Sequence, residues 1–122
     1  MKFSWGWALV GNRDANLPKA AKGQPCQFGF KNVCNRNPET SVLAHYSPLG
    51  HGITGARPPD ESAGVACYDC HNFIDFRDLS RERRLLRDDM VRSGEFACVV
   101  LDGILLTHLM WIRLGIWKRK TG

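Results

Sequence analysis

The pattern of apolar and polar positions predicts short strands in the first part of the chain. Residues 1–10 carry large apolar side chains at every second position, which is the period of a short strand. Residues 40–46 and 64–67 are short runs of β-prone residues. The segment between them, residues 47–62, is rich in glycine and proline. We therefore expect two short strands joined by a long irregular loop.

Helices are predicted after the second of these strands. Residues 72–77 fit the first turns of a helix, and no proline occurs from residue 80 onward. Ser80 suits the N-cap of a helix that runs to about residue 92, where Ser93-Gly94 should end it. A second helix is expected from residue 95 to about residue 114. It is apolar on most of its surface, so we expect it to be the main core-forming element.

The length of 122 residues suits one domain of the α+β class. We divide the chain into a lead, residues 1–16, and a single domain, residues 17–122, with a core at 17–79 and C-terminal helices at 80–122. No secretory signal is recognised at the start. The most apolar stretch, residues 96–112, is interrupted by polar residues and falls short of the roughly 20 apolar residues of a spanning helix. We expect a cytoplasmic protein without a membrane span.

The charge balance leaves polyanion partners open. The chain has 17 Lys and Arg against 12 Asp and Glu, a net charge of +5, and 11 of the 17 are Arg, which suits bidentate phosphate contacts. A solvated basic surface without such a partner fits the composition equally well. The candidates for nucleic-acid contacts lie in the loop, the first C-terminal helix and the basic end: Arg57, Arg81, Arg84, Lys118, Arg119 and Lys120.

Four of the five cysteines are spaced as a metal site. They form two pairs, Cys26-x7-Cys34 and Cys67-x2-Cys70, and two such pairs at a distance are typical of a four-cysteine structural zinc site. Buried free thiols and a redox Cys-x-x-Cys are the alternatives. A redox motif would open a helix in a βαβ setting, which we do not expect before Cys67. Cys98 lies among apolar residues, so we expect a small, inert core side chain.

Histidines and carboxylates form a second candidate constellation. His71 and Asp75 are four residues apart and share a helix face, where a His and a carboxylate can bind one divalent cation. A capping histidine and an acidic residue favoured by the helix dipole are the alternatives. From its residue type alone, His45 fits an ordinary, partly buried histidine.

Motifs spread over residues 17–77 resemble a known family. These are Cys34-Asn-x-Asn-Pro-Glu-Thr40, Leu43-Ala44-His45, Arg57-Pro58-Pro59-Asp60 and Ala66-Cys67-x-x-Cys70-His71-x-x-x-Asp75. Together they resemble the YbcO-like HNH-type nucleases of phages and prophages, which are related to the phage recombination-enhancement nuclease Ref. The C-terminal helices resemble that family only in character, and residues 1–16 have no recognised counterpart.

The resemblance implies a small, zinc-stapled ββα-metal core of HNH type, followed by helices, and a metal-dependent DNA endonuclease in the cytoplasm of a bacterial host. The histidine that closes the first strand, His45, would be the general base. His71 and Asp75 would hold Mg²⁺ or another divalent cation. Asp60 is the nearest candidate for the residue that orients the base. The relation to Ref adds a recombinase filament as a further partner.

One position departs from the HNH pattern. Many such sites carry an acidic residue or a second histidine directly before the general base, and this chain has Ala44 there. The site would then hold its metal with fewer protein ligands and more water, which suits Mg²⁺, or would have lost catalysis. Two further hypotheses therefore stay open. One is a zinc-stapled nucleic-acid-binding module without catalysis, and the other is a protein-interaction module that uses Trp5, Trp7 and the last helix. The oligomeric state is not predicted.

Overall fold

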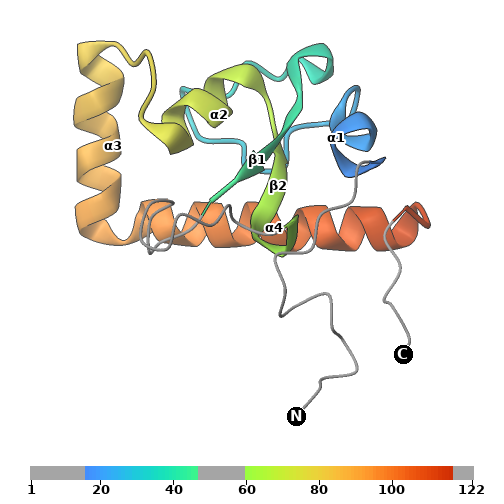
Figure 1. The fold of residues 1–122 in the computed structure, drawn as a ribbon. Helices are drawn as coiled ribbons and strands as arrows, with labels where there is room; N and C mark the ends of the chain where they lie inside the picture. The colour runs from blue at the N-terminus through green and yellow to red at the C-terminus, as the bar shows by residue number, and fades with distance from the viewer. Residues whose placement is uncertain (1–15, 47–59, 117–122) are drawn as a thin grey trace, which may run out of the picture.

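The computed structural model describes residues 16–46 and 60–116, and it has the α+β composition expected. The elements follow in the order α1 (Asn16–Ala21), a 3₁₀ turn (Pro38–Thr40), β1 (Val42–His45), a second 3₁₀ turn (Asp60–Ser62), β2 (Ala63–Ala66), α2 (Tyr68–Asp75), α3 (Arg81–Ser93) and α4 (Glu95–Arg113). In Figure 1, α4 runs along the base with the two strands above it, and α3 stands upright at the N-terminal end of α4. The N-terminal segment predicted as a strand lies outside the described residues.

The two predicted strands pair as an antiparallel sheet. The register joins Val42 to Ala66 and His45 to Ala63, and Tyr46 N–H donates to Ser62 O at 2.9 Å just past the end. Both strands are shorter than or shifted from the predicted runs because neighbouring turns take the flanking residues. The 3₁₀ turn at residues 38–40 occupies the approach to β1, and its cap is Asn37, whose side chain accepts from Glu39 N–H. The order strand, loop, strand, helix is as predicted.

Helix α2 begins four residues earlier than predicted. Cys67 is its N-cap, and its sulfur accepts from Cys70 N–H at 3.3 Å. The sequence pattern did not indicate this cap, because N-cap side chains usually accept through oxygen. The Cys-x-x-Cys pair therefore lies at the start of the helix and not before it. The setting is an antiparallel hairpin, however, and not the βαβ unit of a redox motif. The helix ends at Phe76, which adopts a left-handed conformation (φ 56°).

The two C-terminal helices are confirmed, almost to the residue. Ser80 Oγ accepts from Arg83 N–H at 3.2 Å and caps α3. Gly94 ends α3 in a left-handed conformation (φ 87°), which glycine adopts without steric cost, and α4 begins directly after it. The chain therefore turns sharply from α3 into α4, as Figure 1 shows.

The core role predicted for α4 is only partly right. One stripe of this helix is buried, and it consists of Phe96, Val100, Gly103, Thr107 and Trp111. The opposite side keeps several leucines about half exposed, and Cys98, predicted as a core side chain, is exposed. By length and composition α4 also resembles a membrane-spanning helix, with a mean hydropathy of 1.6. A single such helix is weak evidence, because the core helix of a globular domain passes the same test.

The sheet carries a core cluster on each face. One cluster contains aromatic side chains of the loop after α1, of α2 and of α4: Phe28, Phe30, Phe73 and Phe96, together with Ala44 and Ala66. The other contains Val65 of β2, Trp111 of α4, and Leu17 and Ala21 of α1. Helix α1 was not predicted, because its six residues offer only this one apolar pair at i, i+4 as a signal.

Helix α4 is joined to β2 by a hydrogen bond and by a buried ring. Thr107 Oγ1 accepts from Val65 N–H at 3.0 Å, so the outer edge of β2 is covered. The Phe28 ring lies between Gly103 of α4 and Gly64 of β2. A Cβ built on Gly103 would come within 2.2 Å of that ring, and one on Gly64 within 2.6 Å. Both glycines therefore leave the space that the ring fills.

Candidate functional site

The four cysteines predicted to bind zinc are brought together. Cys26 and Cys34 come from the loop after α1, and Cys67 and Cys70 from the first turn of α2. Their four sulfur atoms all lie within 4.8 Å of one another. Cys67 and Cys70 are buried, while Cys26 and Cys34 are partly exposed. None of the four is paired in a disulfide.

The spacing of the sulfur atoms fits a tetrahedral metal centre. Cys34 Sγ and Cys67 Sγ are 3.8 Å apart. Four ligands at a Zn–S distance of about 2.3 Å in tetrahedral geometry are separated by about 3.8 Å, whereas a disulfide would need about 2.05 Å. A set of four thiols is also the donor type that zinc prefers. The residues present therefore fit a structural zinc ion.

The electrostatics of the cluster favour a bound cation. Burial raises the pKa of Cys34 to about 11, because a thiolate there would lose hydration. Hydrogen bonds from the side chains of Cys26 and Cys70 lower the pKa of Cys67. Burial thus opposes a thiolate at Cys34, whereas hydrogen bonding favours one at Cys67. A divalent metal would displace the remaining protons and neutralise the crowded thiolates.

A hydrogen-bond network outside the cluster ties it to α3. Asp69, which lies between the two cysteines of α2, accepts from Arg83 Nη1 at 3.1 Å and from Asn35 Nδ2 at 3.0 Å. Asn35 follows Cys34 directly. One carboxylate therefore links both cysteine loops to α3. The sequence reasoning missed this network, since nothing in the spacing of Asn35, Asp69 and Arg83 points to it.

His45 and Asp60 meet where the hairpin opens. His45 is the last residue of β1, and Asp60 begins the turn that leads into β2. His45 Nε2 lies 2.8 Å from Asp60 Oδ1, and the Asp60 side chain is only 5% exposed against 19% for His45. An ionised carboxylate only accepts, so the imidazole donates in this pair. The contact is the one expected of a carboxylate that orients a histidine.

His71 and Asp75 form a second pair on α2. His71 Nε2 lies 3.1 Å from Asp75 Oδ2, and Arg77 Nη2 lies 3.6 Å from the same oxygen. Both side chains of the pair are partly exposed, so water and a ligand can reach them. Within residues 16–46 and 60–116, only the cysteines form a group of three or more close metal-ligand side chains. A cation at His71 and Asp75 would therefore complete its shell mainly with water.

Residues next to the two histidine–carboxylate pairs pack against one aromatic side chain. Tyr46, next to His45, packs edge-on against Phe96 of α4 with ring centroids 6.0 Å apart. Phe73, between His71 and Asp75, packs against the same ring at 6.2 Å. The end of β1 and the second half of α2 thus converge on Phe96.

Arg87 of α3 stabilises this convergence. Its Nε donates to Phe73 O at 2.6 Å and its Nη2 to Ile74 O at 2.8 Å, while the guanidinium lies 4.5 Å from the centre of the Phe96 ring. Burial lowers the pKa of Arg87, and the nearby Tyr46 and Asp75 counteract that effect. The Arg87 guanidinium therefore joins α3 to the second half of α2 and to the Phe96 ring, although the sequence pattern did not single it out.

Ala44 faces away from the His45 pair. It is 1% exposed and packs in the aromatic cluster with Phe73, on the sheet face opposite to His45. The missing ligand position is thus an apolar part of the core.

The predicted nucleic-acid contacts are only partly described. Arg81 and Arg84 lie exposed on α3, and Arg84 Nη1 donates to Leu79 O at 3.2 Å. The remaining four candidates, Arg57, Lys118, Arg119 and Lys120, lie outside the described residues.

Comparison with known proteins agrees with the resemblance drawn from the motifs. Residues 15–113 match the family described as "Putative nuclease YbcO". The chain is 40% identical over 104 residues to the "Putative nuclease YbcO" of Escherichia coli K12 and to its namesake in Enterobacteria phage 82, covering 85% of this chain and 98% of each relative. A solved structure titled as a putative bacteriophage protein from Escherichia coli K-12 MG1655 is 35% identical, with a TM-score of 0.56, over 81% of this chain and 99% of that one. The chain is therefore a member of the YbcO family.

Proposed function

We propose that the protein is a metal-dependent DNA endonuclease of the HNH type, acting in the cytoplasm of a bacterial host. The observation that carries the proposal is the 2.8 Å contact between His45 and the buried Asp60. It lies at the end of a hairpin whose following helix carries a second pair, His71 and Asp75. Two relatives carry the name putative nuclease, which supports hydrolysis of nucleic acid in general.

His45 is the general base of the proposed reaction. In the tautomer in which Nε2 donates to Asp60 Oδ1, 2.8 Å away, the neutral ring carries its basic lone pair on Nδ1. Nδ1 takes a proton from the water that attacks the phosphorus. Asp60 is a positioning residue: it selects the tautomer, restricts the ring and stabilises the imidazolium that forms.

His71 and Asp75 are the proposed ligands of a divalent cation. One nitrogen and one carboxylate oxygen 3.1 Å apart on a single helix face fit a shared ion. Bound there, Mg²⁺ or a similar cation would neutralise phosphate charge and stabilise the leaving 3′-oxygen. Arg77 lies near the same carboxylate and adds positive charge at this end of α2.

The four cysteines hold a structural zinc ion in this proposal, and DNA is the substrate. The zinc fixes the start of α2 relative to the loop after α1, and so sets where His71 and Asp75 lie. Arg81 and Arg84 of α3, with Arg57 and the basic residues Lys118, Arg119 and Lys120, are the proposed contacts to phosphates.

A nicking assay on supercoiled plasmid and single-stranded circles tests the proposal. Wild type should cleave with Mg²⁺ or Mn²⁺, and EDTA should stop it. His45→Ala should abolish cleavage, and Asp60→Asn should slow it by about 10²–10⁴-fold. Glu82→Gln, an exposed carboxylate of α3, is the matched control and should cleave as wild type does.

Zinc content and circular dichroism of every variant separate catalysis from folding. The assignment is wrong if His45→Ala cleaves normally, or if it loses zinc or unfolds, since His45 would then be structural. A shift of the pH profile in Asp60→Asn would distinguish positioning of the base from a general loss of stability.

A zinc-stapled nucleic-acid-binding module without catalysis is the second candidate. The buried, apolar Ala44 favours it, because that position offers no ligand to a cation. This candidate predicts salt-dependent DNA binding without cleavage in Mg²⁺, Mn²⁺ or Ni²⁺. Addition of a recombinase filament to the same assay tests whether an activating partner is needed.

A further inference from the structure

The outward face of α4 is a long apolar strip. Leu101, Leu105, Leu109 and Ile112 recur at helical spacing and are 57%, 50%, 48% and 61% exposed. Only 28% of the apolar window of α4 is buried. Contiguous apolar surface of this kind marks an interaction site more often than ordinary surface.

Two charged residues flank the strip on the same side. Asp102 lies near its start and Arg113 at its end, and both are exposed. In the part of the chain that the structure describes, neither has an ion-pair partner within 4.0 Å. An acidic and a basic residue at opposite ends of one helix are complementary to a second, antiparallel copy of that helix.

The positions along α4 are self-complementary. A two-fold axis that passes beside the helix midway between Asp102 and Arg113 also lies midway between Leu106 and Leu109. It lies within one residue of the midpoint between Leu105 and Leu109, and of the midpoint between Leu101 and Ile112. In an antiparallel pair, each of these residues faces its counterpart in the other copy. Every apolar residue in these pairs thus meets an apolar residue, and each acid meets a base.

We propose that the protein forms a homodimer in which two α4 helices pack antiparallel through this outward face. The proposal does not depend on nuclease activity. It buries leucine side chains that otherwise remain in water and forms the ion pair Asp102–Arg113 twice, as a two-fold, isologous interface requires.

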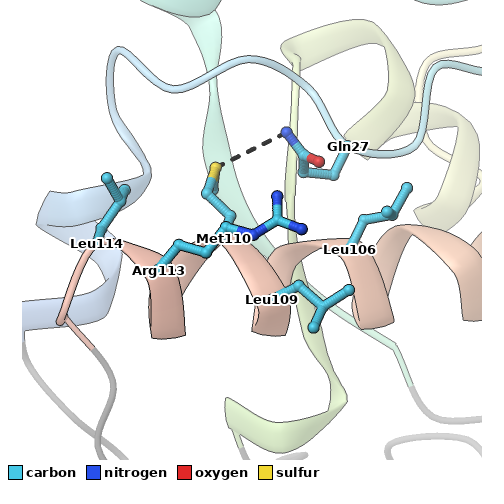
Figure 2. Close-up of a pocket in the computed structure, with 6 residues that line it drawn as sticks. All are labelled: Gln27, Leu106, Leu109, Met110, Arg113 and Leu114. Atoms are coloured by element: carbon cyan, nitrogen blue, oxygen red, sulfur yellow. Dashed lines mark hydrogen bonds between the residues drawn. The ribbon is translucent and has the colours of Figure 1, made fainter.

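A hollow beside the strip can accept an apolar side chain of the second copy. It has a volume of about 300 Å³ and is lined by Leu106, Leu109, Met110, Arg113 and Leu114 of α4 and its end, with Gln27 on the opposite wall. Figure 2 shows Leu106, Leu109 and Arg113 around this opening, and Gln27 reaching Met110 Sδ. In the proposed pairing, Leu106 of the second copy comes opposite Leu109 and enters the hollow.

The size of the strip sets the expected affinity. A helix of 19 residues is about 28 Å long, and an interface one helix wide belongs to the small class. We therefore expect a dissociation constant of about 1–100 µM. At this strength the dimer forms reversibly and is measured by sedimentation velocity over a concentration series.

Charge reversal tests the antiparallel register. Asp102→Arg places Arg opposite Arg twice, and Arg113→Asp places Asp opposite Asp twice. Each variant alone should weaken dimerisation by about 10- to 100-fold. The double variant restores both ion pairs and should dimerise as wild type does. An equimolar mixture of the two single variants should form a heterodimer, because every acid again faces a base. Asp89→Arg on α3 is the matched control and should leave the dimer unchanged.

Three outcomes would overturn the proposal. The first is a wild-type monomer at several hundred micromolar, and the second is dimerisation unaffected by either reversal. The third is binding of the monomer to lipid vesicles through the same leucines, in which case the strip faces a membrane. Failure of cleavage in the nicking assay has no bearing on any of these outcomes.

Discussion

Replacement of Gly103 by alanine gives two opposite predictions, depending on whether the helix or its tertiary contact dominates. Within an isolated helix, Gly→Ala stabilises by about 1 kcal/mol. In the structure, the new Cβ would lie 2.2, 2.5 and 2.7 Å from three atoms of the Phe28 ring. Ordinary carbon contacts are about 3.5–4.0 Å, so the ring would have to move by more than 1 Å.

The Phe28 ring has little room to move. On its other side, a Cβ on Gly64 would already come within 2.6 Å of it, so the ring is held between two backbones. Overpacking of this kind costs about 1–3 kcal/mol. After subtraction of the gain in helix propensity, we expect Gly103→Ala to destabilise the fold by up to about 2 kcal/mol.

A double-mutant cycle measured by urea denaturation isolates the contact. Unfolding is followed by circular dichroism at a fixed concentration of free zinc, so that metal binding is the same for all variants. In a Phe28→Ala background the new methyl group has space, and Gly103→Ala should stabilise by up to about 1 kcal/mol. The expected coupling is about 1–3 kcal/mol, the cost of the overpacked contact. Phe28→Leu serves as the background if Phe28→Ala does not fold.

The sign of the effect decides the outcome. If Gly103→Ala stabilises the wild-type chain by about 1 kcal/mol, Phe28 does not lie against α4, and the packing described for β2 and α4 is wrong. If the substitution destabilises equally in both backgrounds, the cost is not due to the ring.

Three further predictions follow from the site and its surroundings. Cys70→Ser should lose most of the bound zinc and lower the melting temperature, as measured by metal analysis and thermal denaturation; full retention of zinc would exclude Cys70 as a ligand. Arg87→Met should destabilise by about 2–4 kcal/mol in chemical denaturation, because two carbonyl groups of α2 lose a charged donor; Arg87→Lys should recover part of that loss. Burial lowers the pKa of His108 in the folded protein, so the unfolded chain binds a proton at this histidine more readily. The contribution of His108 to stability is therefore fully present above pH 6.5 and is lost as the pH falls below that value. His108→Gln should therefore flatten the fall of the melting temperature between about pH 7.5 and pH 5, and an unchanged slope would contradict the burial argument.

The helices and strands that are set by signals within a few residues could be predicted from the sequence. The Ser80 cap, the glycine stop at Gly94 and the β-prone runs placed α3, α4 and both strands close to their observed positions. The start of α2 was misplaced because a cysteine sulfur, Cys67, takes the place of the usual capping oxygen. Helix α1 was missed, since Leu17 and Ala21 have meaning only against Trp111, about ninety residues away.

For the candidate site, the sequence by itself determined the residue types and the ligand spacing. The cysteine pairs imply a common metal, because two short loops with matched thiols have few other uses in this pattern. The i, i+4 spacing places His71 and Asp75 on one face of any helix that contains them. The tertiary structure decided the rest: Asp60 meets His45 across a 15-residue separation, Phe28 fills the space left by Gly64 and Gly103, and only one stripe of α4 is buried. Local propensity extends over a turn or two of chain, whereas these contacts depend on which distant surfaces pack together, and that is set by the whole fold.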